Sequence, residues 1–118
     1  DGDALASLIV LVRSPQRMLA RAAVESLSYI TKQDFGTSER KWLKWWQVHK
    51  GERRVQWLID GLRSKNRDIR FSSSRELSQL TREYFGYYFD SDKDDRERAV
   101  HRWEAWWEEK GRRMHFDD

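Results

Sequence analysis

The sequence predicts an all-α protein: a short α-solenoid of two helix pairs, each followed by a tryptophan-rich helix. Three observations support this prediction. The 118 residues include one Pro and six Gly, so few positions interrupt long helices. Apolar residues recur at steps of three and four, which is the spacing of one helix face. The first half of the chain also recurs in the second half, as is typical of helical repeat architectures.

The repeat becomes visible when the sequence is shifted by 50 residues. Ten of the 29 positions from 8 to 36 are then identical, far above chance agreement. The shared residues in the first copy are Leu8, Ile9, Arg13, Ser14, Arg17, Leu27, Ser28, Thr31, Phe35 and Gly36. We therefore expect a single domain over residues 1–118, made of repeat 1 at about 3–51 and repeat 2 at about 53–111.

Tryptophans extend the repeat in a different register. A triplet with the spacing i, i+3, i+4 occurs once in each copy: Trp42, Trp45 and Trp46, and again Trp103, Trp106 and Trp107. The second triplet follows the first by 61 residues instead of 50, so the second copy carries 61 − 50 = 11 extra residues. They lie in the stretch 87–97, whose Asp-rich centre predicts a solvated loop.

Each copy is expected to contain three helices. They are a short apolar helix (about 3–13 and 53–63), a longer amphipathic helix (about 15–32 and 66–82) and a Trp-bearing helix (about 38–50 and 96–110). Ser14 and Pro15 predict the start of the first amphipathic helix, because a hydroxyl caps free amides and Pro suits the first helical position. Gly36 and Gly86 predict the turns that follow the longer helices.

The Trp triplets have two interpretations. Their spacing places three indoles on one face of a helix. That face either covers the helix pair and completes a small core, or forms an exposed aromatic platform for a ligand, a sugar or a base. Recurrence at the same place in both copies favours the structural role for both triplets. Trp57 has Ser7 as its counterpart, which leaves it free to reach the surface.

The amphipathic helices resemble the second helix of HEAT repeats. Segments 19–27 and 69–77 follow the pattern of an aliphatic residue, then Arg, two small residues and Leu, with Ala20 in place of the usual Arg. The Thr-x-x-x-Phe-Gly…Trp-x-x-Trp-Trp tail is similar to an extension of bacterial HEAT-repeat proteins. The resemblance covers residues 4–111 and implies an armadillo-like scaffold whose curved helix face binds a partner without performing a reaction. Two repeats are fewer than a solenoid normally needs.

Composition excludes several classes of protein. The net charge of +3, from 23 basic and 20 acidic residues, is too balanced to indicate nucleic acid by itself. The absence of Cys excludes disulfides, thiolate metal sites and Cys nucleophiles, and leaves both redox compartments open. No apolar run approaches ~20 residues, so we expect no membrane span. The chain lacks an initiator Met and a signal peptide, and we expect it to belong to a longer protein.

The sequence contains no recognisable catalytic arrangement. Its three histidines share no metal-ligand spacing with one another or with the carboxylates. Asp90, Asp92 and Asp94 alternate as the ligands of a calcium loop do. Such a loop also requires Gly at its sixth position and Glu at its twelfth, where this chain has Asp95 and His101. We therefore expect a solvated acidic loop, no metal, no cofactor and no enzymatic activity.

Basic residues mark a candidate binding edge. Arg13 and Arg63 occupy equivalent positions in the two copies, as do Arg17 and Arg67. The complete edge is Arg13, Arg17, Arg63, Lys65, Arg67 and Arg70. In stacked repeats the equivalent side chains would lie about one helix spacing, ~10 Å, apart. These residues either pair with nearby Asp and Glu or bind an acidic partner or a phosphate.

The leading hypothesis is a non-catalytic protein–protein interaction or scaffolding module of a larger bacterial protein. The alternative is a nucleic-acid-binding module that uses the basic Arg edge, since the longer HEAT-like DNA glycosylases place basic edges on this architecture. A structural spacer without a partner is the third interpretation. The absence of catalytic spacing and the duplicated helix pairs favour the first hypothesis.

Overall fold

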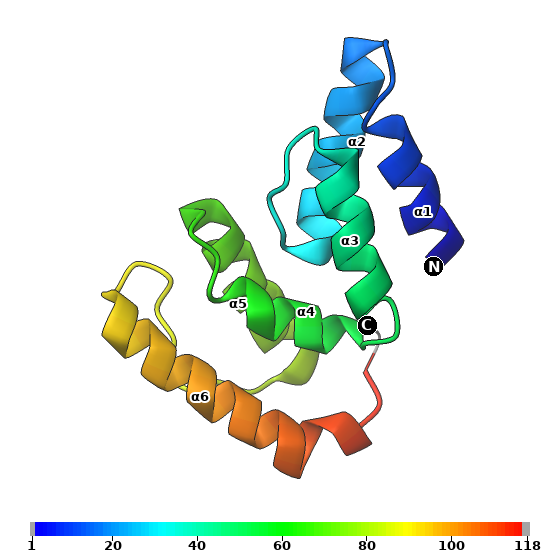
Figure 1. The fold of residues 1–118 in the computed structure, drawn as a ribbon. Helices are drawn as coiled ribbons and strands as arrows, with labels where there is room; N and C mark the ends of the chain where they lie inside the picture. The colour runs from blue at the N-terminus through cyan, green and yellow to red at the C-terminus, as the bar shows by residue number, and fades with distance from the viewer. Residues whose placement is uncertain (1, 117–118) are drawn as a thin grey trace. The chain divides into compact units, whose positions relative to one another are not determined.

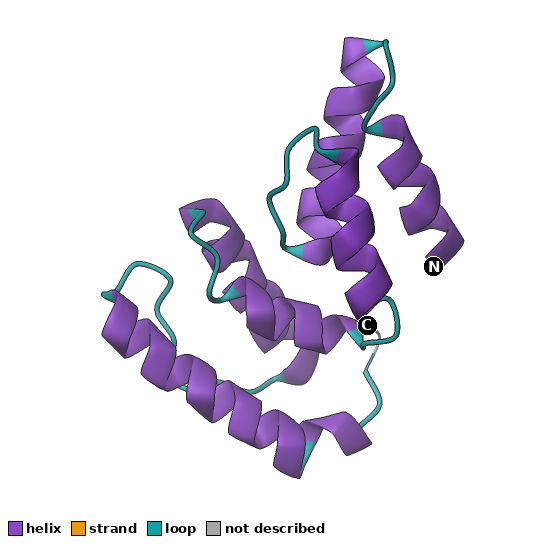
Figure 2. Ribbon diagram, viewed as in Figure 1, coloured by secondary structure: helices purple, strands orange, loops and turns teal. Residues whose placement is uncertain are grey.

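The computed structural model describes residues 2–116, and these residues contain helices and loops but no β-strand (Figure 2). The all-α prediction is confirmed. The chain divides into two compact units, residues 1–52 and 53–118, and the boundary falls between the two sequence repeats. No helix within residues 2–116 combines the length and the apolar character needed to cross a bilayer.

The first unit contains three helices: α1 (Gly2–Leu11), α2 (Arg17–Thr31) and α3 (Glu39–His49) (Figure 1). α1 packs against both α2 and α3. The buried apolar side chains of this unit are Leu5, Ile9, Val12, Ala20, Ala23, Leu27, Trp42 and Trp45. The small residues of α2 allow its neighbour to approach closely, and Trp42 of α3 is the largest fully buried side chain.

The second unit repeats this order with α4 (Arg54–Gly61), α5 (Arg67–Thr81) and α6 (Lys93–Glu109), followed by a 3-10 turn, η1 (Gly111–Arg113). α4 packs against α5 and α6. Its core is Val55, Leu58, Ile59, Leu62, Leu77, Tyr87, Ala99, Val100, Trp103, Trp106 and Trp107. Leu80, Phe85, Phe89 and Phe116 pack on its edge.

The amphipathic helices begin later than the sequence suggests. α2 starts at Arg17 instead of about residue 15, because Ser14 Oγ accepts a hydrogen bond from the amide of Gln16 (3.1 Å) inside the preceding turn. In the second unit Asn66 caps α5, and its side chain accepts from the amide of Asp68 at 2.9 Å. Both helices therefore cover equivalent positions, offset by 50 residues.

The two long helices end in the same way. The hydroxyls of Thr31 and Thr81 each donate to the carbonyl four residues earlier, at 2.6 and 2.7 Å. The next residues, Lys32 and Arg82, adopt the left-handed conformation with φ of 59° and 60°. Such a residue ends a helix, because its amide bonds back to a free carbonyl of the last turn. The repeat in sequence thus corresponds to a repeat in local structure.

The Phe-Gly pair after each long helix anchors the Trp-bearing helix. The ring of Phe35 lies edge-on to Trp42 at 4.9 Å between centroids, and Phe85 lies edge-on to Trp103 at 4.7 Å. The glycine after each Phe has a positive φ, 55° and 79°, which turns the chain toward the next helix. In the first unit Trp42 Nε1 also donates to the carbonyl of Gly36 at 2.8 Å.

The insertion in the second copy is less solvated than predicted. Tyr87 is buried, and its hydroxyl donates to the carbonyl of Leu62 at 2.6 Å. α6 begins at Lys93 instead of about residue 96, because the Asp92 side chain caps it by accepting from the amide of Asp95 at 2.8 Å. The Asp-rich centre is exposed as predicted, at Asp90, Asp92, Asp94 and Asp95, but from Lys93 onward it belongs to α6 and not to a loop.

Trp57 does not reach the surface. It lies on α4, a helix of eight residues that is buried on most of its circumference. Its side chain is 7% exposed, as buried as the indoles of α6. A helix this short and this apolar has little exposed face on which to place an indole.

Candidate binding surfaces

Two carboxylates of α6 hold Arg63 of the α4–α5 turn. Its guanidinium donates to Glu97 at 2.7 to 3.0 Å and to Glu104 at 2.7 and 3.2 Å. The hydrogen bonds to Glu97, and then those to Glu104, raise the pKa of Arg63 above its usual range. The same bonds lower the pKa of Glu97. This arrangement ties the turn to α6, and bidentate geometry gives it direction as well as attraction.

The other two arginines that the second copy contributes to the predicted edge, Arg67 and Arg70, are also engaged within the chain. Arg67 Nε donates to Asp90 Oδ1 at 3.2 Å and its guanidinium lies over the Phe89 ring. That hydrogen bond lowers the pKa of Asp90. Arg70 donates to the carbonyl of Phe89 at 2.9 Å and to two carbonyls of the α4–α5 turn at 3.0 and 3.2 Å. These contacts fasten the insertion to α5 and leave few donors for a ligand.

The other members of the predicted edge are freer. Arg13 Nη1 lies 3.4 Å from Glu39 Oε1, which is a solvent-exposed pair of small energetic weight. Arg17 and Lys65 are exposed, and their side chains form no ion pair with the residues that the structure describes. The alignment of both copies into one continuous edge stays a prediction.

The Trp triplets face inward. Trp42, Trp45, Trp103, Trp106 and Trp107 are buried, and Trp46 is half-buried. The rings of α6 contact one another and Phe85 at centroid distances of 4.7 to 6.3 Å. This packing uses the indoles as core, and a platform for a stacked ligand would require exposed faces.

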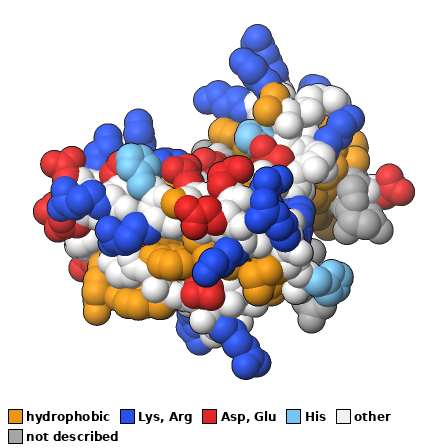
Figure 3. Space-filling model, turned by 90° about the horizontal axis from the view of Figure 1, so that it is seen from below, with side chains coloured by type: hydrophobic (Ala, Val, Ile, Leu, Met, Phe, Trp, Pro, Cys, Tyr) orange, Lys and Arg blue, Asp and Glu red, His pale blue; other side chains and the backbone are white. Residues whose placement is uncertain are grey.

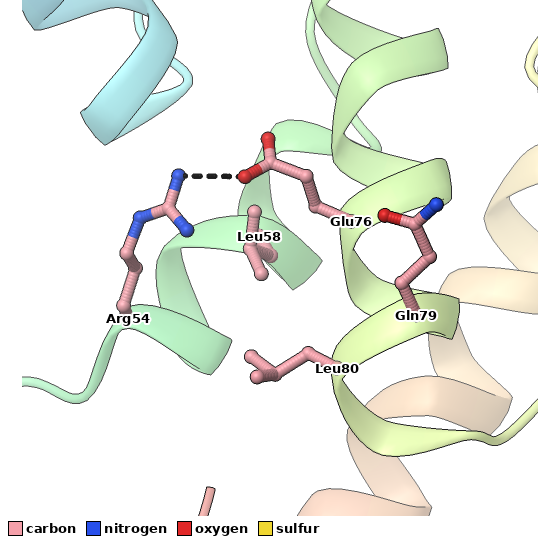
Figure 4. A pocket seen from close by; sticks show the side chains of 5 residues that line it. All are labelled: Arg54, Leu58, Glu76, Gln79 and Leu80. Atoms are coloured by element: carbon pink, nitrogen blue, oxygen red, sulfur yellow. Dashed lines mark hydrogen bonds and ion pairs between the residues drawn. The ribbon is translucent and has the colours of Figure 1, made fainter. Parts of the chain in front are cut away.

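A pocket of about 320 Å³ opens between α4 and α5 (Figure 4). It is lined by Arg54, Leu58, Glu76, Gln79 and Leu80. Arg54 Nη2 donates to Glu76 Oε1 at 3.1 Å, and Figure 4 shows the two side chains pointing toward one another from the two helices. Because the ion pair offsets both charges, the lining does not indicate an anionic or a cationic ligand.

Acidic residues of the insertion pair with Arg67 and cap α6. Asp90 is bound to Arg67, and Asp92 caps α6. Within residues 2–116, no three His, Asp or Glu side chains gather as a metal ion would require. Two of the three side chains that the sequence aligned as a calcium loop, Asp90 and Asp92, therefore have other partners, and Asp94 is exposed.

One end of the α1–α2 helix pair exposes apolar side chains. Val10 and Leu11 end α1, while Met18 and Leu19 lie in the first turn of α2. Met18 is 86% exposed and Val10 is 66% exposed. Single exposed apolar residues are ordinary on proteins, but several at one end of a helix pair form a candidate contact surface.

The outward face of α3 is basic, and the sequence reasoning did not single it out. Arg40, Lys41 and Lys44 are exposed and form no ion pair with the residues described. Leu43 and Val48, 42% and 68% exposed, flank them. We call these five residues the α3 face. This face could have been predicted from the sequence, because helical positions between three inward-facing indoles point outward.

α6, the equivalent helix of the second copy, has a different outer face. With the offset of 61 residues, the three cations of the α3 face correspond to His101, Arg102 and Ala105. Arg102 donates to the carbonyl of Phe85 at 2.8 Å. The two flanking apolar residues correspond to Glu104 and Glu109. The α3 face is therefore particular to the first copy and is not a general requirement of the repeat.

On the face shown in Figure 3, side chains of both signs of charge are mixed. Comparison of the chain with known protein families, with curated proteins and with solved structures yields no match. The function of the chain is therefore inferred from the surfaces described above.

Proposed function

We propose that the chain is a non-catalytic protein–protein interaction module, built from two HEAT-like helix pairs with their Trp-bearing helices and stacked as a short armadillo-like α-solenoid within a larger scaffolding protein. The observation that carries the proposal is the apolar end of the first helix pair, Val10, Leu11, Met18 and Leu19. Burying such side chains against a partner is favourable by roughly 25 cal/mol for each Å² of apolar surface removed from water.

The contacts of the arginines favour a protein partner over nucleic acid. Phosphate binding through the predicted edge needs free guanidinium groups, whereas Arg63, Arg67 and Arg70 donate to carboxylates and carbonyls of their own unit. The phosphate backbone of nucleic acid also offers no apolar contact to exposed Met and Val side chains, because it is recognised through charge. A scaffold needs similar helical units that present different surfaces, and the two units of this chain have similar helices with different outer faces.

An affinity capture with matched variants tests the proposal. The full chain is immobilised as wild type, as Val10→Ser with Met18→Ser, and as Tyr84→Ser with Tyr88→Ser. The last pair is the control, since Tyr84 and Tyr88 are exposed to a similar extent, 64% and 65%, but lie in the second unit. We expect a defined protein that the wild type and the control retain and the first variant loses.

Two results would contradict the proposal. Recovery of nucleic acid alone, with binding that falls steeply with salt through counterion release, would favour the alternative function. Retention of no protein at all by the wild type would favour a spacer role. Circular dichroism of each variant before the capture confirms that the helices are intact.

A further inference from the structure

We propose that the α3 face binds an acidic peptide segment that carries aliphatic side chains, such as an amphipathic helix of the partner. The inference rests on the proposed function in one respect, namely that the partner is a protein. It adds the surface that contacts this partner and the chemistry that the partner presents. The α3 face comprises Arg40, Lys41 and Lys44, with Leu43 and Val48 beside them.

The charge of the α3 face is not compensated within the described chain. Several arginines elsewhere are held by carboxylates or carbonyls, as Arg63 is by Glu97 and Glu104 and Arg67 is by Asp90. The acidic residue of α3 itself, Glu39, is directed to Arg13. The three cations of the α3 face therefore project into solvent as a cluster of one sign, which attracts an anionic partner and orients its approach.

The positions of these cations are unfavourable for the helix on its own. Arg40 and Lys41 lie in the first turn of α3, where the helix dipole disfavours positive charge. Lys44 is four residues after Arg40 and three after Lys41, so like charges are neighbours on the helix surface. Such departures from the local preferences of a helix are typical of functional surfaces.

The two exposed apolar residues of the α3 face indicate which class of anionic partner it binds. Leu43 and Val48 lie on the same side of α3 as the cations and are exposed, whereas the second copy has Glu104 and Glu109 at the equivalent positions. A phosphate backbone offers these side chains no apolar contact. An acidic segment with Leu, Ile or Val at helical spacing offers both a carboxylate for each cation and an aliphatic side chain for each flank.

A peptide-display selection tests the inference. The full chain is used to select from a random peptide library, alongside Arg40→Glu, Lys41→Glu, Lys44→Glu as a triple variant. The matched control is Arg75→Glu, Lys93→Glu, Lys110→Glu, three exposed cations of the second unit outside the predicted edge, whose reversal changes the net charge equally. Lys41→Gln with Lys44→Gln serves as a milder variant, and circular dichroism verifies that each variant is folded.

We expect the selected peptides to be rich in Asp and Glu, with aliphatic residues at i, i+3 or i+4. Reversal of the α3 face should weaken their binding at least about tenfold, and the control triple variant should bind nearly as the wild type does. Neutral or basic selected sequences, or an equal loss in both triple variants, would overturn the inference and leave the proposed function standing. Tighter binding to a DNA duplex than to any selected peptide, lost on reversal of the α3 face, would overturn both, as would a selection that enriches no peptide.

Discussion

Substitution of Gly111 by Ala should damage the core of the second unit. Gly111 follows α6 at the start of η1, and a Cβ built there would lie 2.7 and 2.8 Å from ring carbons of Trp106 and 2.8 Å from Trp107 Cε3. Carbon atoms pack at about 3.5–4.0 Å, so both indoles would have to move. Each is buried, and Trp106 also contacts Phe116, so neither can move without disturbing its neighbours.

We expect the cost at the upper end of the range for overpacking, about 3 kcal/mol. In a unit of this size the midpoint of thermal unfolding should fall by roughly 12–24 °C, at about 4–8 °C for each kcal/mol. Gly51, the counterpart in the first copy, provides the matched control, because a Cβ there meets nothing within 4 Å. Gly51→Ala should change stability by less than about 0.5 kcal/mol.

Urea unfolding followed by tryptophan fluorescence measures both free energies on the full chain. The reasoning is refuted if Gly111→Ala unfolds at the same urea concentration as the wild type. It is refuted equally if Gly51→Ala is as damaging, because the effect would then reflect lost glycine flexibility instead of the clash with the indoles.

Three further predictions concern single polar groups of the second unit. Ser73 Oγ is buried without a hydrogen-bond partner, so Ser73→Ala should raise the free energy of unfolding by about 1 kcal/mol in urea titration; a decrease would contradict this. Tyr87→Phe should lower it by about 1–2 kcal/mol in the same titration, because the carbonyl of Leu62 loses its partner, and an unchanged midpoint would speak against the burial of that bond. Arg63 lowers the pKa of Glu97, so the stabilisation by this pair is complete above the unfolded pKa of about 4.3 and is lost as pH falls through the lower folded value. Because the pair is partly exposed, Glu97→Gln should lower the free energy of unfolding by roughly 0.5 kcal/mol at neutral pH and leave it unchanged near pH ~2. An equal loss at both pH values would disprove the assignment.

The helices were predictable because two independent signals agree in the sequence. Apolar spacing located each helix, and the duplication confirmed it in a second copy. The errors at helix starts have a local cause: Ser14 bonds inside the turn instead of capping the helix. The late prediction of α6 was avoidable, since Asp92 followed by Asp94 and Asp95 is a recognisable helix start.

The contacts of the candidate edge were not predictable from the sequence. Arg63 lies 34 and 41 residues from the two carboxylates that bind it. The predicted helix over 96–110 already places Glu97 and Glu104 on one face, but nothing in the sequence indicates that this face meets the turn that contains Arg63. Likewise, no pattern in the insertion signals that Tyr87 reaches the carbonyl of Leu62. The sequence could separate inward from outward positions, whereas the partners of long polar side chains depend on tertiary packing.

The central claim is that the first unit contacts a protein partner through its apolar end and the α3 face. Hydrogen–deuterium exchange of the full chain, with and without the captured protein, tests this claim most directly, because bound surfaces are protected at each backbone amide. The account predicts new protection at the end of α1, the start of α2 and along α3, with α6 unchanged. Protection confined to α4–α6, or none in the first unit, would contradict it.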